Sequence, residues 1–259
     1  MRINEQDLDK LLTRFTGYSV KGHGSSFKKI CLGFFPSNVV PSFHADIPFD
    51  ATSIQSNYKT YYQLSDSSFS VYIYYNLIQI MKREDFSFLR YRFINDNWYC
   101  FDNLPLFVSV KVNDPLIQQV NFFIEDVAGM SWSEFSHAYR LGIETHRKSK
   151  TSMVPPEGGW YGVSHLLTTL AFDFTGYIPS QKHNDFNAHA PWFVLSQKQM
   201  IDDKVHFTLS CTLSHASSLP SELDLFINTL KQALINVPDK QKITNYFTAV
   251  DVSRTLTLG

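Results

Sequence analysis

The stretch from Lys204 to Leu234, KVHFTLSCTLSHASSLPSELDLFINTLKQAL, constrains the fold most, because it joins a strand to a helix through one short turn. In its first half apolar and polar residues alternate: Val205, Phe207, Leu209, Cys211 and Leu213 against His206, Thr208, Ser210, Thr212 and Ser214. A period of two predicts a strand with one buried face. His215 follows on the apolar parity. We therefore expect its side chain at the end of the strand, half removed from water and facing a cavity.

The second half of this stretch predicts a helix that packs back on the sheet. Pro220 is typical of a first helical turn, and Ser221 with Asp224 predicts a capping box, so the two start signals differ by a residue or two. From Leu223 to Leu234, apolar residues recur at helical spacing. The sequence therefore predicts one apolar stripe along this helix.

Length and charge bound the class of protein. The chain has 259 residues and no segment that resembles a linker, so we expect a single domain over residues 1–259. Its formal net charge is -1. Nucleic-acid binders and proteins that bind anionic membranes need clustered Lys and Arg, so we expect neither kind of partner.

The cysteines and the first residues indicate a compartment. Cys31, Cys100 and Cys211 are far apart, odd in number and in no CxxC spacing, so neither a disulfide framework nor a zinc knuckle is expected. The first residues, MRINEQDLDKLL, are charged where a signal peptide needs an apolar core, and no run approaches the roughly 18 apolar residues of a membrane span. We expect a soluble cytoplasmic protein.

The other elements are predicted from periodicity and turn signals. Helices are expected over residues 4–15, from 50 or 52 to 61, from 66 or 67 to 83, and from a capping box at Ser131 and Glu134 to about 148. Strands are expected over 30–35 and 42–49, over 86–94, 98–102 and 106–112 as an antiparallel meander, and over 118–124, 160–174 and 191–198. Loops are expected over 17–29, 149–159 and 178–190, and a hairpin across 200–203 joins the last strand to the one that precedes His215. The sum is an α/β fold, a two-layer α/β sandwich with helices on one side of a large mixed β-sheet.

This order of elements resembles chloramphenicol acetyltransferase and its superfamily of CoA- and carrier-dependent acyltransferases, which includes dihydrolipoyl acyltransferase cores and peptide-synthetase condensation domains. The resemblance rests on an ordered series of local matches: FHADIPFDAT at 43–52, SWSEFSHAYR at 131–140, AFDF at 171–174, APWF at 190–193 and SHASSLPSELDLFINTL at 214–230. It covers about four-fifths of the chain. The region 1–42 diverges from the family, and the tail 238–259 has only weak signals.

The resemblance implies roles for particular residues. His215 occupies the second, catalytic histidine of the HHxxxDG motif, the general base that takes a proton from the acceptor hydroxyl as it attacks the acyl thioester. A histidine titrating near pH 6.5 suits this task at neutral pH. The motif is degenerate: Ser214 replaces its first histidine, Leu219 its aspartate and Pro220 its glycine. In the family that aspartate pairs with an arginine to hold the active-site loop, so its loss concerns the loop more than the proton transfer.

Further site residues follow from the same resemblance. Ser164 is the candidate for the oxyanion-stabilising serine, and Phe43 and Phe193 are candidates for contact with the substrate. Val194 stands where the family often has a threonine near the oxyanion. The implied activity is acyl transfer from a CoA or carrier-protein thioester to a hydroxyl or amine of a small molecule, by a homotrimer with its active site between subunits. No permanently bound cofactor is implied. The alternative is a catalytically degenerate homologue that binds a ligand or serves as a scaffold in a biosynthetic complex.

Two competing interpretations concern other residues. His183 and His189, with Asp185 between them, can be drawn as a metal site, but zinc ligands are usually closer together and include a third definable ligand, so a solvated loop is favoured and no metal is expected. Cys211 can be drawn as a nucleophile, but a small buried cysteine is more often apolar filling.

Overall fold

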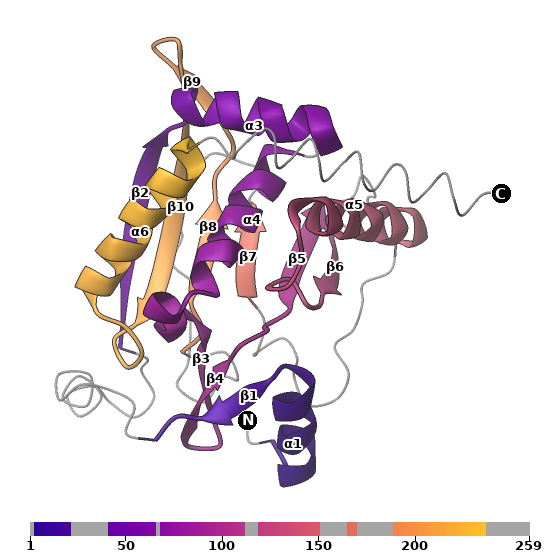
Figure 1. The fold of residues 1–259 in the computed structure, drawn as a ribbon, viewed down its shortest axis with the longest axis vertical. Coiled ribbons are helices and arrows are strands. Elements are labelled where there is room, and N and C mark those ends of the chain that lie inside the picture. The colour runs from indigo at the N-terminus through magenta and orange to yellow at the C-terminus, as the bar shows by residue number, and fades with distance from the viewer. Residues whose placement is uncertain are drawn as a thin grey trace.

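Helices cover one side of a large mixed sheet, the two-layer α/β arrangement that the sequence predicts (Figure 1). The computed structural model describes residues 3–21, 41–65, 68–111, 119–150, 165–169 and 189–236. Among these residues the sheet has seven strands, in the order β2-β10-β8-β7-β5-β6, with β9 paired to the start of β10. The strands are β2 Ser42–Asp50, β5 Leu106–Lys111, β6 Gln119–Ile124, β7 His165–Thr169, β8 Trp192–Leu195, β9 Gln199–Ile201 and β10 Lys204–Ser214. β7 is parallel to both β5 and β8, while the other pairs are antiparallel.

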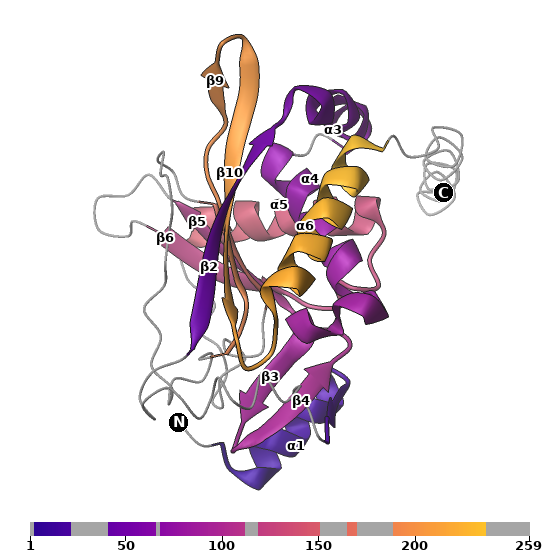
Figure 2. The same cartoon turned by 90° about the vertical axis from the view of Figure 1, so that its left-hand side faces the viewer.

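The helical layer packs on the apolar face of this sheet. Its helices are α3 Thr52–Ser65, α4 Phe69–Met81, α5 Trp132–Ser149 and α6 Pro220–Ile235. Figure 2 shows the strands nearly edge-on, with α3, α4 and α6 on the same side. The stripe predicted for α6 is confirmed, because Phe226, Leu230 and Leu234 are fully buried in the main core. Each such side chain contributes about 1.5–3 kcal/mol when it is removed from water.

Strand β10 differs from its prediction on one face. Leu209 and Leu213 belong to the core beneath the helices, as the alternation predicts. On the opposite face, however, Ser210, Thr212 and Ser214 are also buried, so the prediction of a single buried face is wrong for the second half of the strand. Because β10 lies between β2 and β8, these hydroxyls are enclosed by neighbouring strands. Buried hydroxyls are tolerated where they find hydrogen-bond partners.

The two capping boxes have different outcomes. At the start of α5, the Ser131 hydroxyl accepts from the Glu134 N–H, and the Glu134 carboxylate accepts from the Ser131 N–H at 2.8 Å, which confirms the predicted box. At the start of α6, the predicted box of Ser221 and Asp224 is wrong. Leu219 is the N-cap and Pro220 the first helical residue. The leucine side chain has no hydrogen-bond acceptor. The only capping-box hydrogen bond possible there is the one from the Leu219 N–H to the Glu222 carboxylate.

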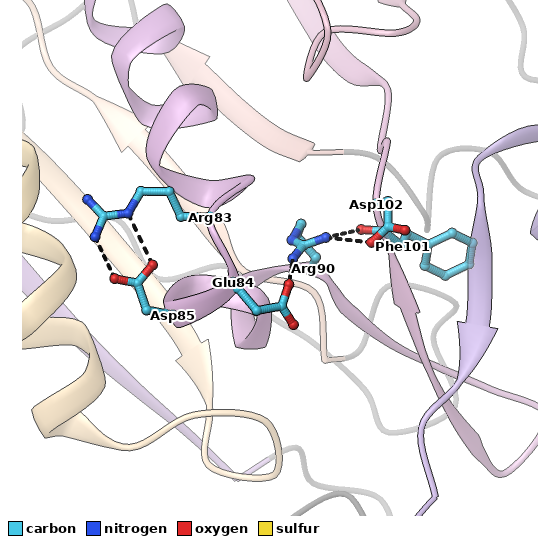
Figure 3. Close-up of polar contacts among 6 residues, drawn as sticks. All are labelled: Arg83, Glu84, Asp85, Arg90, Phe101 and Asp102. Atoms are coloured by element: carbon cyan, nitrogen blue, oxygen red, sulfur yellow. Dashed lines mark hydrogen bonds and ion pairs between the residues drawn. The ribbon is translucent and has the colours of Figure 1, made fainter.

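The predicted meander is also wrong, because its strands belong to two sheets. Residues 84–90 form a 3-10 helix, so the first strand is shorter than predicted, β3 Tyr91–Ile94. It pairs with β4 Asn97–Phe101 in a separate three-stranded sheet, whereas β5 joins the large one. Arg90 fixes the end of this segment: its guanidinium donates to the Phe101 carbonyl at 3.2 Å and to Asp102 at 2.9 Å, and it reaches Glu84 (Figure 3).

The small sheet is completed by β1 Gly17–Ser19, within a segment predicted to be loop. The small sheet packs against α1 Glu5–Arg14, which confirms the predicted first helix (Figure 1). A Cβ on Gly17 would lie 2.7 Å from the Phe101 ring, so glycine is required for this close approach. The predicted strand 30–35, residues 151–159 of the predicted loop 149–159, and the tail 238–259 lie outside the described residues. Among the described helices, none has the length and apolarity needed to cross a membrane.

Candidate active site

His215 lies directly after β10, as the strand parity predicts, and its side chain is half-buried. Its backbone N–H donates to the Pro41 carbonyl at 2.7 Å. Its ring lies against Phe43 of β2, with 4.8 Å between the ring centroids and 47° between the planes. Burial lowers the pKa of His215 below its ordinary value of 6.5. At neutral pH the imidazole is therefore uncharged, the form that can accept a proton.

The turn after His215 is held by backbone hydrogen bonds to Ser214. The Ser214 carbonyl accepts from the N–H groups of Ser217 at 3.1 Å and Ser218 at 2.9 Å. The Ser214 hydroxyl accepts from the Ala216 N–H at 3.1 Å. The next N–H, of Leu219, donates to the Glu222 carboxylate at 2.6 Å. Every backbone N–H from residue 215 to 219 thus has an acceptor.

His189 contacts this turn from a distant part of the chain. Its Nδ1 lies 2.8 Å from the Ser214 hydroxyl oxygen, and the residue is only 3% exposed. The interpretation of this segment as a solvated loop is therefore wrong for His189, while His183 and Asp185 lie outside the described residues. The apolar residues that follow it, Ala190 to Val194, were the signal that could have placed it inside. No group of three or more metal-ligating side chains occurs in the described part of the chain.

The remaining predicted site residues lie elsewhere. Ser164 is outside the described residues, so its predicted role stays a prediction. Phe193 is 1% exposed and packs against Phe226 in the core beneath α6, and its contact with substrate also stays a prediction. Cys211 is fully buried, and burial raises the pKa of its thiol well above the ordinary value. A buried thiol that stays protonated is apolar filling, because the thiolate is the nucleophile.

A second histidine lies next to the Ser164 position. His165 begins β7 and is buried. Burial, together with the nearby positive charges of Arg92 and Arg90, lowers the pKa of His165 to about 3. This imidazole is therefore neutral throughout the physiological range.

Sequence reasoning missed a polar network on the face of the sheet away from the helices. His44 of β2 places its Nδ1 2.9 Å from the Thr212 hydroxyl and its Nε2 2.9 Å from the Asp46 carboxylate. The Ser210 hydroxyl donates to the same carboxylate. The pairing of β2 with β10 sets Thr212 opposite His44 and Ser210 opposite Asp46. The polar residues at alternate positions of β2 and β10 were the sequence signal that could have indicated this network.

Comparison with solved structures identifies the fold. No protein-family model matches the chain, and no curated protein matches it by sequence. A chloramphenicol acetyltransferase superposes with a TM-score of 0.63 at 15% identity, over 84% of this chain and 99% of that one. The cubic core of the pyruvate dehydrogenase multienzyme complex gives 0.57 at 12% identity, over 76% and 83%. The X-domain from teicoplanin biosynthesis gives 0.50 at 10% identity, over 90% and 54%. The chain therefore has the chloramphenicol acetyltransferase-like fold.

Proposed function

We propose that this protein transfers an acyl group from a CoA or carrier-protein thioester to a hydroxyl or amine of a small molecule, with His215 as the general base. The observation that supports this most is the state of His215, a neutral, half-buried imidazole at the end of a fully hydrogen-bonded turn. A base must be unprotonated and held in place when the acceptor binds. The chloramphenicol acetyltransferase-like fold supports the same reaction class.

In the proposed reaction, His215 takes the proton of the acceptor hydroxyl as its oxygen attacks the thioester carbonyl carbon. The tetrahedral intermediate then collapses, the C–S bond breaks, and His215 returns the proton to the departing thiolate. The oxyanion of the intermediate needs a hydrogen-bond donor, for which Ser164 is our candidate. Phe43, which contacts the His215 ring, is our candidate for the apolar wall against the acceptor. The thioester is a co-substrate, so no permanently bound cofactor is required.

The proposed assembly is a homotrimer of single-domain subunits, by resemblance to the acyltransferase family. In such an assembly, His215 of one subunit would face its neighbour across the active site. Size-exclusion chromatography with light scattering measures this directly, because a monomer has a mass of 29.8 kDa and a trimer three times that mass. A stable monomer that still transfers acyl groups would contradict the shared site.

The competing function is that of a ligand-binding or scaffold protein. Two observations favour it: Leu219 and Pro220 replace motif residues, and the fold extends to the X-domain from teicoplanin biosynthesis. The two functions differ in whether the chain produces an acylated compound. A scaffold binds without turnover.

The test is acyl transfer by the purified chain. Acyl-CoA donors are incubated with a small-molecule extract, thiol release is followed, and acylated products are identified by mass spectrometry. His215→Ala is expected to lower the rate by roughly two to four powers of ten. His206→Ala is the matched control, because His206 lies on the same strand with a half-buried side chain and is expected to keep the wild-type rate. A His215→Ala variant as active as the wild type removes the base from the mechanism. A wild type without product favours the scaffold.

A further inference from the structure

We propose that His189 is a positioning residue that holds the turn bearing His215, through the Ser214 hydroxyl. The inference rests on the proposed function, because positioning matters for catalysis only if His215 is the base. It assigns a role to a residue that is 26 positions before His215 in the sequence and has no place in the family motif. The argument starts from the bonds that the Ser214 hydroxyl makes.

The Ser214 hydroxyl has a defined set of partners. The Ala216 N–H donates to its oxygen at 3.1 Å, which uses one lone pair. His189 Nδ1 lies 2.8 Å from the same oxygen, and the Pro41 carbonyl lies 3.5 Å away. A hydroxyl offers one proton and two lone pairs, so His189 completes its bonding in either tautomer. Ser214 is buried, and so the hydroxyl's orientation depends on these protein partners.

His189 is itself fixed by two aromatic rings. Its ring centroid lies 5.4 Å from those of Phe93 and Trp98. These two residues face each other across the β3–β4 hairpin, with their rings 5.2 Å apart. At 3% exposure the imidazole has little room to move. His189 therefore connects the small sheet to the exit of β10.

The Ser214 hydroxyl also holds the two residues on either side of His215 together, because it accepts from the Ala216 N–H. Ser214 precedes it and Ala216 follows it, and both are buried, whereas His215 itself is half-buried. One hydrogen bond therefore spans the residue that bears the base. The third anchor is the His215 N–H, which donates to Pro41. If the Ser214 hydroxyl turns, the Ala216 N–H loses its acceptor, and the hydrogen bond that spans His215 is lost. A misplacement of about 1 Å in a catalytic group can lower a rate about a hundredfold.

The test separates the hydrogen bond from ring packing. His189→Phe keeps a ring against Phe93 and Trp98 but removes Nδ1. It is expected to lower kcat about ten- to a hundredfold, with the KM for the acyl donor within about twofold of the wild type. His189→Asn places an amide nitrogen near the Nδ1 position and is expected to restore most of kcat. Rescue by the smaller side chain is not expected if packing alone matters.

A second pair of measurements makes the result decisive. Ser214→Ala should lower kcat at least as far as His189→Phe, because it removes the contact with His189 and also the acceptor of the Ala216 N–H. The double variant should be no slower than Ser214→Ala, because the contact with His189 is already lost in that variant. Amide hydrogen exchange at Ala216 should be faster in each variant, since its N–H donates to the Ser214 hydroxyl. If His189→Phe does not fold, Ser214→Ala removes the contact from its other side, and His189→Asn, which keeps a polar group at the Nδ1 position, is the control.

The outcomes distinguish the two proposals. Wild-type kcat together with wild-type exchange at Ala216 in His189→Phe would overturn the positioning role. Additive losses in the double variant would also overturn it. If the wild type transfers no acyl group, the proposed function fails alone, and the exchange rate at Ala216 still decides whether His189 holds the turn.

Discussion

The two ends of strand β10 are built in opposite ways. The chain enters β10 through Asp202 and Asp203, an exposed two-residue turn, after the 68%-exposed Met200. It leaves through the buried turn that follows Ser214. Both connections are short. The entry turn depends on its own residues, whereas the exit turn has hydrogen-bond partners that are distant in the sequence.

At the entry, local sequence is sufficient. Asp202 and Asp203 have φ angles of 49° and 61°, the left-handed conformation that a two-residue hairpin turn of type I′ requires. At the exit, the partners are distant in sequence: Pro41 and His189 both contact the turn. A functional group can be held by a turn of the second kind without any local motif. This explains how contacts with distant segments order the turn.

Histidines gather at the exit end. The pairing of Leu166 with Trp192, and of Trp192 with Thr212, places His165 near the level at which β10 ends. His189 and His215 lie at the same end, and all three are buried or half-buried. At the entry end, the only histidine on the described part of β10 is His206. Acid should therefore affect the two ends differently.

The largest expected difference is in stability against acid. The pKa of His165 is about 3 in the folded protein, against about 6.5 unfolded, because burial and two arginines oppose its charge. Between these values the unfolded state binds a proton that the folded state does not. The free energy of unfolding should thus fall as pH drops below about 6.5, by up to ~1.4 kcal/mol per pH unit from this group. Urea unfolding at a series of pH values measures the slope.

The control compares the two ends directly. His165→Phe should flatten the slope between pH 3 and 6.5, whatever its effect at neutral pH. Met200→Gln, at the exposed entry end, changes no titrating group and should leave the slope unchanged. Equal slopes in the wild type and in His165→Phe would show that His165 is not buried in neutral form.

The next difference is in the pH dependence of the reaction. Burial lowers the pKa of His215 below 6.5, and a histidine that acts as our proposed base must be unprotonated. We expect kcat/KM to be level at neutral pH and to fall about tenfold per pH unit below that pKa, so the acid limb lies below pH 6.5. The profile is measured over the range in which circular dichroism shows the fold intact. A limb centred above pH 6.5 would assign the base to another group.

The same contrast explains what the sequence could predict. The alternation in β10 and the stripe in α6 correctly predicted a strand and a helix that pack together, because the apolar residues of both belong to the main core. The meander was mispredicted because nothing near residues 86–94 indicates that Arg90 turns toward Asp102 and Glu84. Periodicity reports which face is buried but not which sheet a strand joins.

The site was predictable only in part. The position of His215 at the end of β10 followed from the parity of the strand, which concerns its immediate neighbours. His189 could not be found in this way, because its contact with Ser214 spans 25 residues and depends on where Phe93 and Trp98 place its ring. The network of His44 and Asp46 depends in the same way on the register between β2 and β10. Hydrogen bonds between distant segments leave no periodic signal.

The smallest expected effect is at the entry turn. Asp203 adopts a φ of 61°, which glycine reaches without the steric cost of a Cβ. Asp203→Gly should therefore raise the free energy of unfolding by about 0.5–1 kcal/mol in urea titrations, because Asp-Gly is a preferred pair for this turn. Acyl transfer should not change, since the turn lies at the far end of β10 from His215. Asp203→Val is the opposing control and should destabilise, because a β-branched residue resists this conformation. A loss of kcat in Asp203→Gly would mean that the two ends of β10 are coupled, and the contrast between a local entry and a long-range exit would no longer hold.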